Sequence, residues 1–243
     1  MRRTDSKKSP WNIAIIPARG GSKRIPRKNI KLFCGKPIIA YSIIAAQDTK
    51  LFDRIIVSTD DHEIADIALE WGAEIPFIRP QYLADDYAVT IDVINHGIEW
   101  LNKNDRRYDN ACCIYPTAPF VRISDLKNGY ELIKDTTTNF AFPVATFPSS
   151  IFRALKIEEH TNSLKMFWPE HLNTRTQDLP EALHDVGQFY WGKTDAFLKK
   201  LSMFEQHARP ILIPRYLAQD IDTPEDWEQA ELFYRTLYPK NGK

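Results

Sequence analysis

The chain has 243 residues, with 32 lysines and arginines against 32 aspartates and glutamates, so its formal net charge is zero at pH 7. Balanced charge gives no reason to expect binding to nucleic acid or to an anionic membrane, and no apolar stretch is long enough to span a bilayer. No apolar signal core follows the charged start of the chain. We therefore expect a cytoplasmic protein with a disordered leader over residues 1–10 and one α/β domain over residues 11–243.

The first strong pattern is an apolar run over residues 13–16, which Pro17 ends and a basic loop follows. The run is short enough to be one buried strand. Gly20 and Gly21 allow backbone N–H groups to approach an anion, which the loop's cations would neutralise, namely Arg19, Lys23, Arg24, Arg27 and Lys28. The loop matches neither a Walker A nor a G-x-G-x-x-G pattern. It predicts a polyphosphate site, and the alternative is a solvated basic loop without a ligand.

Strand and helix patterns then alternate along the chain. Helices are expected over residues 37–47, 61–71, 91–101 and 124–134, and further strands over residues 55–57, 73–79, 110–115 and 140–147. Residues 58–60, and Ser124 or Asp125, are expected to cap helices. This alternation predicts a mostly parallel, doubly wound sheet with helices on both faces. Ligands bind beyond the carboxyl ends of such strands, so the basic loop, residues 58–60, Arg79 and Thr117 are expected to meet there.

The pattern changes over residues 148–185, where short apolar segments alternate with polar turns and aromatic residues are dense. We expect an inserted β-rich excursion that docks on a partner subunit, and the alternative is a flexible surface insertion. The chain then returns to the body. A helix is expected over residues 193–201, a strand over 211–213 and an amphipathic helix over 224–238.

Asp220 and Asp222 precede the last helix and are two residues apart. In an extended segment both carboxylates point to one side, where they can bind a hard cation such as Mg²⁺. Thr223 before Pro224 is the better helix cap, with Asp226 completing a capping box. The two aspartates are thus predicted to be Mg²⁺ ligands, with capping as the alternative. No Ser-His-Asp, Cys-His or zinc pattern is recognisable in the sequence.

The chain resembles the CMP-sialic acid synthetase family in six segments that occur in the same order: ARGGSKRIPRKN, STD, RPQYLADDYAVT, YPTAPFVR, RTQDLP and DIDTPEDW. The resemblance covers residues 11–238. It implies a Rossmann-like nucleotidyltransferase fold, a homodimer, and transfer of CMP from CTP to a nine-carbon 2-keto sugar acid with release of pyrophosphate. The segments FCGKP, SSIFRALKI and HDVGQFYWG favour pseudaminic acid as the acceptor. Sialic acid, legionaminic acid, 3-deoxy-octulosonate and a non-catalytic nucleotide-binding module remain alternatives.

The resemblance also implies roles for individual residues in CTP binding. The phosphates and the nucleotide would be held by Arg19, Ser22, Lys23, Lys28 and Asn29. Cytosine and ribose would be read by the backbone of Ala18 and Ala88, together with Arg79 and Thr90. Asp220 and Asp222 would bind Mg²⁺, and the catalytic residues would be Arg19, Lys23 and Asp222.

Further residues are implied for the sugar acid. Within the subunit these are Tyr115, Gln188, Phe189 and Tyr190. Lys156 and Arg175, which lie in the excursion, would reach the sugar carboxylate in the partner subunit's site. Tyr115 stands where sialic acid synthetases usually carry glutamine, and this departure favours a different nonulosonic acid.

Overall fold

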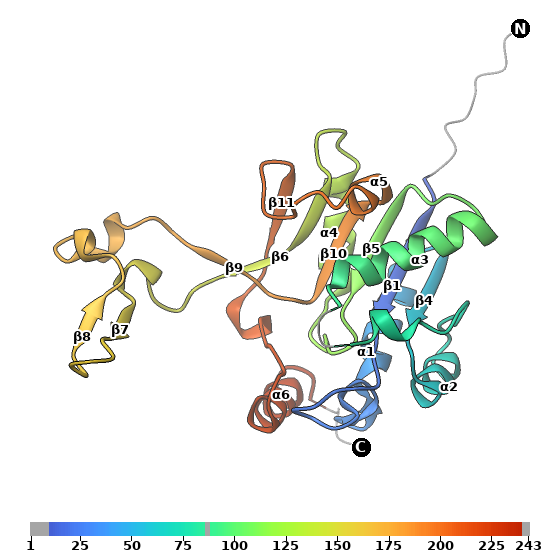
Figure 1. Ribbon diagram of the computed structural model, residues 1–243, viewed down its shortest axis with the longest axis horizontal. Coiled ribbons are helices and arrows are strands. Elements are labelled where there is room, and N and C mark those ends of the chain that lie inside the picture. The colour runs from blue at the N-terminus through green and yellow to red at the C-terminus, as the bar shows by residue number, and fades with distance from the viewer. Residues whose placement is uncertain (1–9, 86–87, 240–243) are drawn as a thin grey trace, which may run out of the picture.

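A single seven-stranded sheet forms the centre of the computed structural model, which describes residues 10–85 and 88–239 (Figure 1). The predicted leader lies outside the described residues except for Pro10. The strands follow the order β11-β6-β10-β5-β1-β4, and β9 pairs with β6. Their bounds are Asn12–Pro17 for β1, Arg54–Ser58 for β4, Asn110–Ile114 for β5, Phe140–Thr146 for β6, Leu183–Asp185 for β9, Phe189–Lys193 for β10 and Ala208–Leu212 for β11.

Five of these strands run in one direction, so the predicted mostly parallel sheet is confirmed. β1 is parallel to β4 and β5, and β11 is parallel to β6. β10 is antiparallel to both β5 and β6, and β9 is antiparallel to β6. The reversal follows from the excursion: β6 ends at the carboxyl edge, and the chain re-enters the sheet at that edge, so the next strands run back.

Helices cover both faces of the sheet. Their bounds are Ile38–Thr49 for α1, His62–Glu70 for α2, Thr90–Asn104 for α3, Ile123–Ile133 for α4, Thr194–Leu198 for α5 and Pro224–Leu237 for α6. Side chains of β1 alternate between two cores: Ile16 joins the core against α1, α2, α4 and α6, and Ile15 joins the core against α3 and α5. Within the described residues, no helix is long and apolar enough to cross a membrane.

Three local predictions were wrong. Residues 73–79 form only isolated bridges at Glu74 and Ile78, because Pro76 lacks the N–H that a continuous ladder needs. Residues 58–60 do not cap α2; Asp61 does, accepting the Ile64 N–H at 3.0 Å. Neither Ser124 nor Asp125 caps α4, which begins one residue earlier. In contrast, the capping box of Thr223 and Asp226 at α6 is confirmed.

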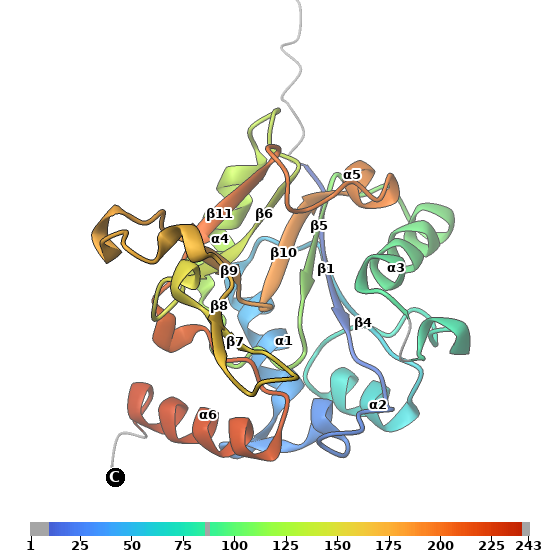
Figure 2. The same cartoon turned by 60° about the vertical axis from the view of Figure 1, so that its left-hand side comes forward.

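Residues between β6 and β9 leave the body of the molecule and project away from it (Figures 1 and 2). This excursion contains one hairpin, formed by β7 (Leu155–Ile157) and β8 (Leu164–Met166). Its large apolar side chains are well exposed, among them Leu155, Ile157, Leu164 and Phe167. A second small hairpin, β2 (Leu32–Phe33) with β3 (Lys36–Pro37), precedes α1. The predicted role of the excursion in dimerisation stays a prediction.

Candidate active site

A cavity of about 330 Å³ lies at the ends of β1 and β5. Its lining includes Pro17, the last residue of β1, and Tyr115 and Pro116, which follow β5. This is the carboxyl edge of the parallel strands, where the sequence predicts a site. The cavity wall brings together ten of the predicted residues: Arg19, Ser22, Lys23, Lys28, Asn29, Arg79, Ala88, Thr90, Tyr115 and Asp222. The strand-end residue Thr117 also lines it. We call it the nucleotide cavity below.

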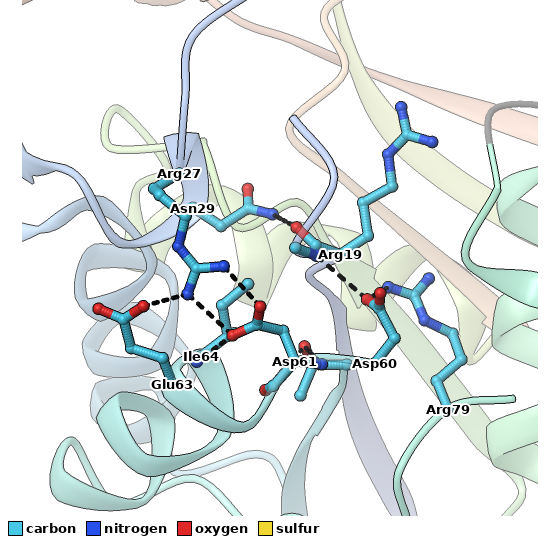
Figure 3. A network of polar contacts seen from close by, with 10 residues as sticks. Arg19, Arg27, Asn29, Asp60, Asp61, Glu63, Ile64 and Arg79 are labelled. Carbon is cyan, nitrogen blue, oxygen red and sulfur yellow. Dashed lines mark hydrogen bonds and ion pairs between the residues drawn. The ribbon is translucent and has the colours of Figure 1, made fainter. Parts of the chain in front are cut away.

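The basic loop is fixed at its start by backbone and side-chain hydrogen bonds. Ala18 donates its N–H to the Ser58 carbonyl at 2.9 Å. Asn29 donates from Nδ2 to the Arg19 carbonyl at 2.9 Å, which ties the two ends of the loop together (Figure 3). Arg19 in turn donates from Nη1 to the Asp85 carbonyl at 2.7 Å. The loop therefore has a defined shape rather than that of a solvated tether.

Arg27 stabilises the loop instead of lining the cavity. It donates to both carboxylate oxygens of Asp61, at 2.5 and 2.8 Å, and also contacts Glu63 (Figure 3). These bonds lower the pKa of Asp61 to about 2, against the opposing effect of burial. Arg27 adopts a left-handed backbone with φ of 55°. The prediction that Arg27 neutralises a ligand's charge is therefore corrected. Its guanidinium instead pairs with Asp61 and Glu63 at the N-terminus of α2.

Two other cations of the loop hold the segment before α6. Lys28 donates from Nζ to the Ile221 carbonyl at 2.7 Å and pairs with Asp222 at 3.2 Å. Arg24, which the sequence analysis counts among the loop's anion-neutralising cations, pairs with the other Asp222 oxygen at 2.8 Å. The cavity wall holds five cationic side chains against the two carboxylates of Asp85 and Asp222. Its excess positive charge favours a polyanion.

Arg79 is the buried cation of the wall, with only 5% of its surface exposed. Nη1 donates to the Leu83 carbonyl at 3.3 Å, whereas Nε and Nη2 have no hydrogen-bond partner among the described residues. Burial lowers the pKa of Arg79, and the nearby carboxylate of Asp60 partly offsets this effect. A buried guanidinium with open donors is suited to acceptor atoms of a ligand.

A second cavity, of about 350 Å³, adjoins the nucleotide cavity and shares Thr90 and Tyr115 with it. Thr90 Oγ1 lies 3.2 Å from the Tyr115 hydroxyl. Tyr190 also lines this cavity and donates its hydroxyl to Asp185 at 2.5 Å. Its apolar lining comes mainly from α3 and from the segment after α5, including Ile94, Leu201, Met203 and Phe204. We call it the acceptor cavity below. Residues 201–204 were not among the predicted site residues, because no motif or periodic pattern marks them.

Two predicted sugar contacts, Gln188 and Phe189, have side chains directed elsewhere. Gln188 is 3% exposed and donates from Nε2 to the Leu217 carbonyl at 2.7 Å. Phe189 is fully buried in the core on the α4 face. Side chains alternate along a strand, so of the β10 residues Phe189 and Tyr190 only Tyr190 faces the acceptor cavity. The structure thus corrects these two side-chain assignments.

Asp220 and Asp222 present hard oxygen donors on two different cavities. Asp222 lines the nucleotide cavity, and Asp220 lines a small one of about 270 Å³ with His184 and Asp185. Burial and the charge of Asp222 raise the pKa of Asp220. Among the described residues, no group of three or more His, Cys, Asp or Glu side chains is arranged for a metal ion. Mg²⁺ needs only one or two carboxylates when phosphates complete its shell, so these donors fit it.

Three other predicted residues, Ala18, Lys156 and Arg175, do not line the nucleotide cavity. Ala18 is fully buried beneath the loop. Lys156 lies in β7, 3.9 Å from Glu158, and Arg175 pairs with Asp178 at 2.7 Å. Both cations belong to the excursion, which projects from the body (Figure 1). Their role in a partner's site stays a prediction.

Comparisons with known proteins show the family to which the chain belongs. The chain belongs to the cytidylyltransferase family, which it matches over residues 13–241. It is 44% identical to a pseudaminic acid cytidylyltransferase of Campylobacter jejuni over 224 residues, which are 92% of this chain and 96% of that protein. It is 33% identical to the CMP-N,N'-diacetyllegionaminic acid synthase of Legionella pneumophila, over 90% of this chain and 94% of the other.

Among solved structures, the chain has the fold of a CMP:2-keto-3-deoxy-manno-octonic acid synthetase complexed with CTP. The TM-score is 0.67 at 18% sequence identity, and the match covers 93% of this chain and 99% of the other. The predicted Rossmann-like nucleotidyltransferase fold is thereby confirmed.

Proposed function

We propose that the protein transfers CMP from CTP to the anomeric hydroxyl of a nonulosonic acid, with pseudaminic acid as the preferred acceptor. The observation that carries this proposal is the 44% identity, over nearly the full length of both chains, to a pseudaminic acid cytidylyltransferase. The cationic nucleotide cavity beside an acceptor cavity supports it independently. Because CTP is the donor, we place the reaction in the cytoplasm.

In the reaction, the anomeric oxygen attacks the α-phosphorus of CTP while the bond to pyrophosphate breaks. The hydroxyl proton passes to solvent as the new bond between oxygen and the α-phosphorus forms, and the electron pair of the broken P–O bond leaves with pyrophosphate. Arg19, Lys23 and Lys28 hold the phosphates in line with the incoming oxygen. Positioning and charge neutralisation supply most of the rate in transfers of this kind.

The base and ribose occupy the other half of the nucleotide cavity. Nε of Arg79, which has no hydrogen-bond partner among the described residues, would donate to an acceptor atom of cytosine, while Nη2 stays near the Asp60 carboxylate. Thr90 and the backbone of Ala88 complete this wall. Because Arg79 is buried, its hydrogen bonds to the base form in a low dielectric, where an unmatched base leaves donors unpaired at a cost of about 1–3 kcal/mol.

The acceptor sugar lies in the adjoining cavity, with its anomeric carbon toward the shared residues Thr90 and Tyr115. The hydroxyls of Tyr115 and Tyr190 bind polar groups of the sugar, and Asp185 orients Tyr190. Burial raises the pKa of both tyrosines, so both hydroxyls stay protonated. The Tyr190 hydroxyl donates to Asp185, so its oxygen is left to accept a hydrogen bond from the sugar. The apolar side chains around Met203 suit acyl or methyl substituents of the sugar.

Asp220 and Asp222 are the residues that would hold Mg²⁺. The ion, when bound, supplies charge neutralisation at the phosphoryl oxygens. On the protein side, Asp222 pairs with Arg24 and Lys28; a cation held by Asp222 would leave these two side chains available to phosphate. Turnover is expected to require a divalent cation, measured as pyrophosphate release with and without chelator.

The protein acts as a homodimer in this proposal, with Lys156 and Arg175 reaching the partner's acceptor cavity. The exposed apolar side chains of the excursion support docking. A complementation experiment tests this arrangement. Lys23→Ala and Arg175→Ala variants are each expected to be inactive, whereas mixed dimers regain activity at one of their two sites. Failure of mixed dimers, isolated with two different affinity tags, to regain activity would refute the shared site.

The function itself is tested by pyrophosphate release from CTP with a panel of sugar acids: pseudaminic, legionaminic, sialic and 3-deoxy-octulosonic acid. We expect the highest kcat/KM for pseudaminic acid. Legionaminic acid is the second candidate, because the chain is 33% identical to a synthase of its CMP derivative. CTP binding without release for any sugar would favour a non-catalytic nucleotide-binding module and contradict the proposal.

A further inference from the structure

One carboxylate, that of Asp60, contacts both the basic loop and the buried arginine of the nucleotide cavity wall. Asp60 follows Thr59 at the carboxyl end of β4 and is not itself part of the cavity wall. Its Oδ1 atom accepts the Gly20 N–H at 3.1 Å. The same atom lies 3.7 Å from Nη2 of Arg79 (Figure 3). A single oxygen thus contacts both the basic loop and the buried arginine.

The two partners of Asp60 belong to different parts of the proposed CTP site. Gly20 lies in the loop between Arg19 and Ser22, which face the phosphates. Arg79 lies in the wall that faces the base, and within the described residues Asp60 is the acid that forms an ion pair with it. Any displacement of the loop at Gly20 therefore shifts the counter-charge of Arg79.

We propose that Asp60 is a positioning residue that couples phosphate binding in the loop to base binding at Arg79. A phosphate that orders the loop also fixes the Asp60 carboxylate and, through it, the guanidinium. The second ligand then finds its partner already ordered and loses less conformational entropy on binding. By linkage, base binding strengthens phosphate binding by the same factor. This inference rests on the proposed function of the cavity as a CTP site.

Asp61, the next residue, provides a matched comparison. It binds Arg27 through both oxygens and caps α2 through Ile64, but it has no recorded contact with Arg79 among the described residues. Asp61 therefore stabilises the loop through Arg27 but does not connect the loop to Arg79. Replacing it perturbs stability without removing the link between Gly20 and Arg79.

The test is calorimetry with two fragments of the nucleotide, cytidine and pyrophosphate, in the absence of sugar acid. In the wild-type protein, saturating pyrophosphate is expected to tighten cytidine binding at least about fivefold, the lower end of usual coupling. Asp60→Ala removes both contacts and brings this ratio close to one. Asp60→Asn keeps an acceptor for Gly20 but loses the charge facing Arg79, so it gives an intermediate ratio.

Asp61→Asn is the control. It is expected to lower the free energy of unfolding, while saturating pyrophosphate still tightens cytidine binding by the same factor as in the wild-type protein. In steady-state kinetics, Asp60→Ala raises the KM for CTP far more than it lowers kcat. The inference is overturned if Asp60→Ala keeps a fivefold ratio, if the wild-type protein binds cytidine without coupling, or if Asp61→Asn loses the ratio equally. Absence of any cytidine binding by the wild-type protein would contradict the proposed function as well, so the two failures are distinguishable.

Discussion

Gly20 and Gly21 are neighbours in the basic loop, yet the structure gives them very different tolerance to a side chain. A Cβ atom at Gly20 would lie 2.6 Å from Asp61 Oδ2, 3.0 Å from its Cβ and 3.2 Å from its Cγ. A Cβ atom at Gly21 would meet nothing within 4 Å. The pair Gly20→Ala and Gly21→Ala therefore separates the effect of this one contact from the loss of a glycine.

The magnitude follows from what holds Asp61 in place. Its carboxylate is fixed by Arg27 and by the Ile64 N–H, so the side chain cannot turn away freely. Relieving the overlap by moving the loop costs about 1–3 kcal/mol, as for other overpacked sites. Relieving it by moving Asp61 forfeits a helix cap, which is about 1 kcal/mol, and weakens the pair with Arg27. By either route Gly20→Ala is expected to lower the free energy of unfolding by about 1–3 kcal/mol.

Urea unfolding followed by circular dichroism measures the free energy of unfolding of each variant. A CTP titration of each variant measures how the substitution in the loop changes the affinity for CTP. Gly20→Ala is expected to bind CTP more weakly because the loop moves, whereas Gly21→Ala stays within about 0.5 kcal/mol of wild type in stability. If the two variants unfold at the same urea concentration, the packing of Gly20 against Asp61 does not constrain the loop and this reasoning is wrong.

Three further predictions concern charge. Lys23→Ala is expected to lower kcat/KM more than tenfold, or about 2 kcal/mol if the lysine meets charge that builds up in the transition state; a near-normal rate would dismiss that role. Asp222→Asn should reduce turnover more than CTP affinity, compared by kinetics and calorimetry, and retained turnover with Mg²⁺ would contradict metal binding there. The pKa of Asp61 in the folded protein, about 2, lies below its ordinary value of 3.8. The ionised carboxylate therefore stabilises the fold above about pH 4, and this contribution disappears as the pH falls towards 2. Acid unfolding should therefore be steeper for wild type than for Asp61→Asn, and parallel curves would exclude the effect.

Sequence patterns predicted the sheet because strand and helix periods are local properties. Apolar runs such as residues 13–16 and the Pro-containing start of α6 carry their own signals. The reversed direction of β10 has no such signal, since it depends on where the excursion returns to the sheet. The alternation along β10 likewise decides which of Phe189 and Tyr190 faces the acceptor cavity, and that requires knowing which sheet face the cavity adjoins.

The candidate site could be predicted where a single segment supplies several cationic side chains. It could not be predicted where the role of a side chain depends on the distant carboxylate with which it pairs. The basic loop was recognised as an anion site from its composition, but composition cannot tell Arg24 from Arg27. Arg27 pairs with Asp61, which is 34 residues further along the chain. Arg24 instead forms an ion pair with Asp222, which lies near the other end of the sequence. Asp60 shows the same limit: its contacts with Gly20 and Arg79 form only once β4 lies beside β1.

The pairing of Asp222 with Arg24 and Lys28 joins the anion site to the proposed metal site. A cation at Asp222 competes with these two side chains, and a polyphosphate competes with Asp222 for them. If the polyphosphate or the cation binds alone, it breaks the ion pairs of Asp222 and leaves either the carboxylate or the two cationic side chains without a partner. Leaving a charge unpaired costs more free energy than binding both ligands together. Together, the phosphate takes the cationic side chains and the divalent ion takes the carboxylate. Mg²⁺ and CTP are therefore expected to bind with mutual enhancement, for a reason that lies in the protein's own charges as well as in the affinity of the ion for the nucleotide.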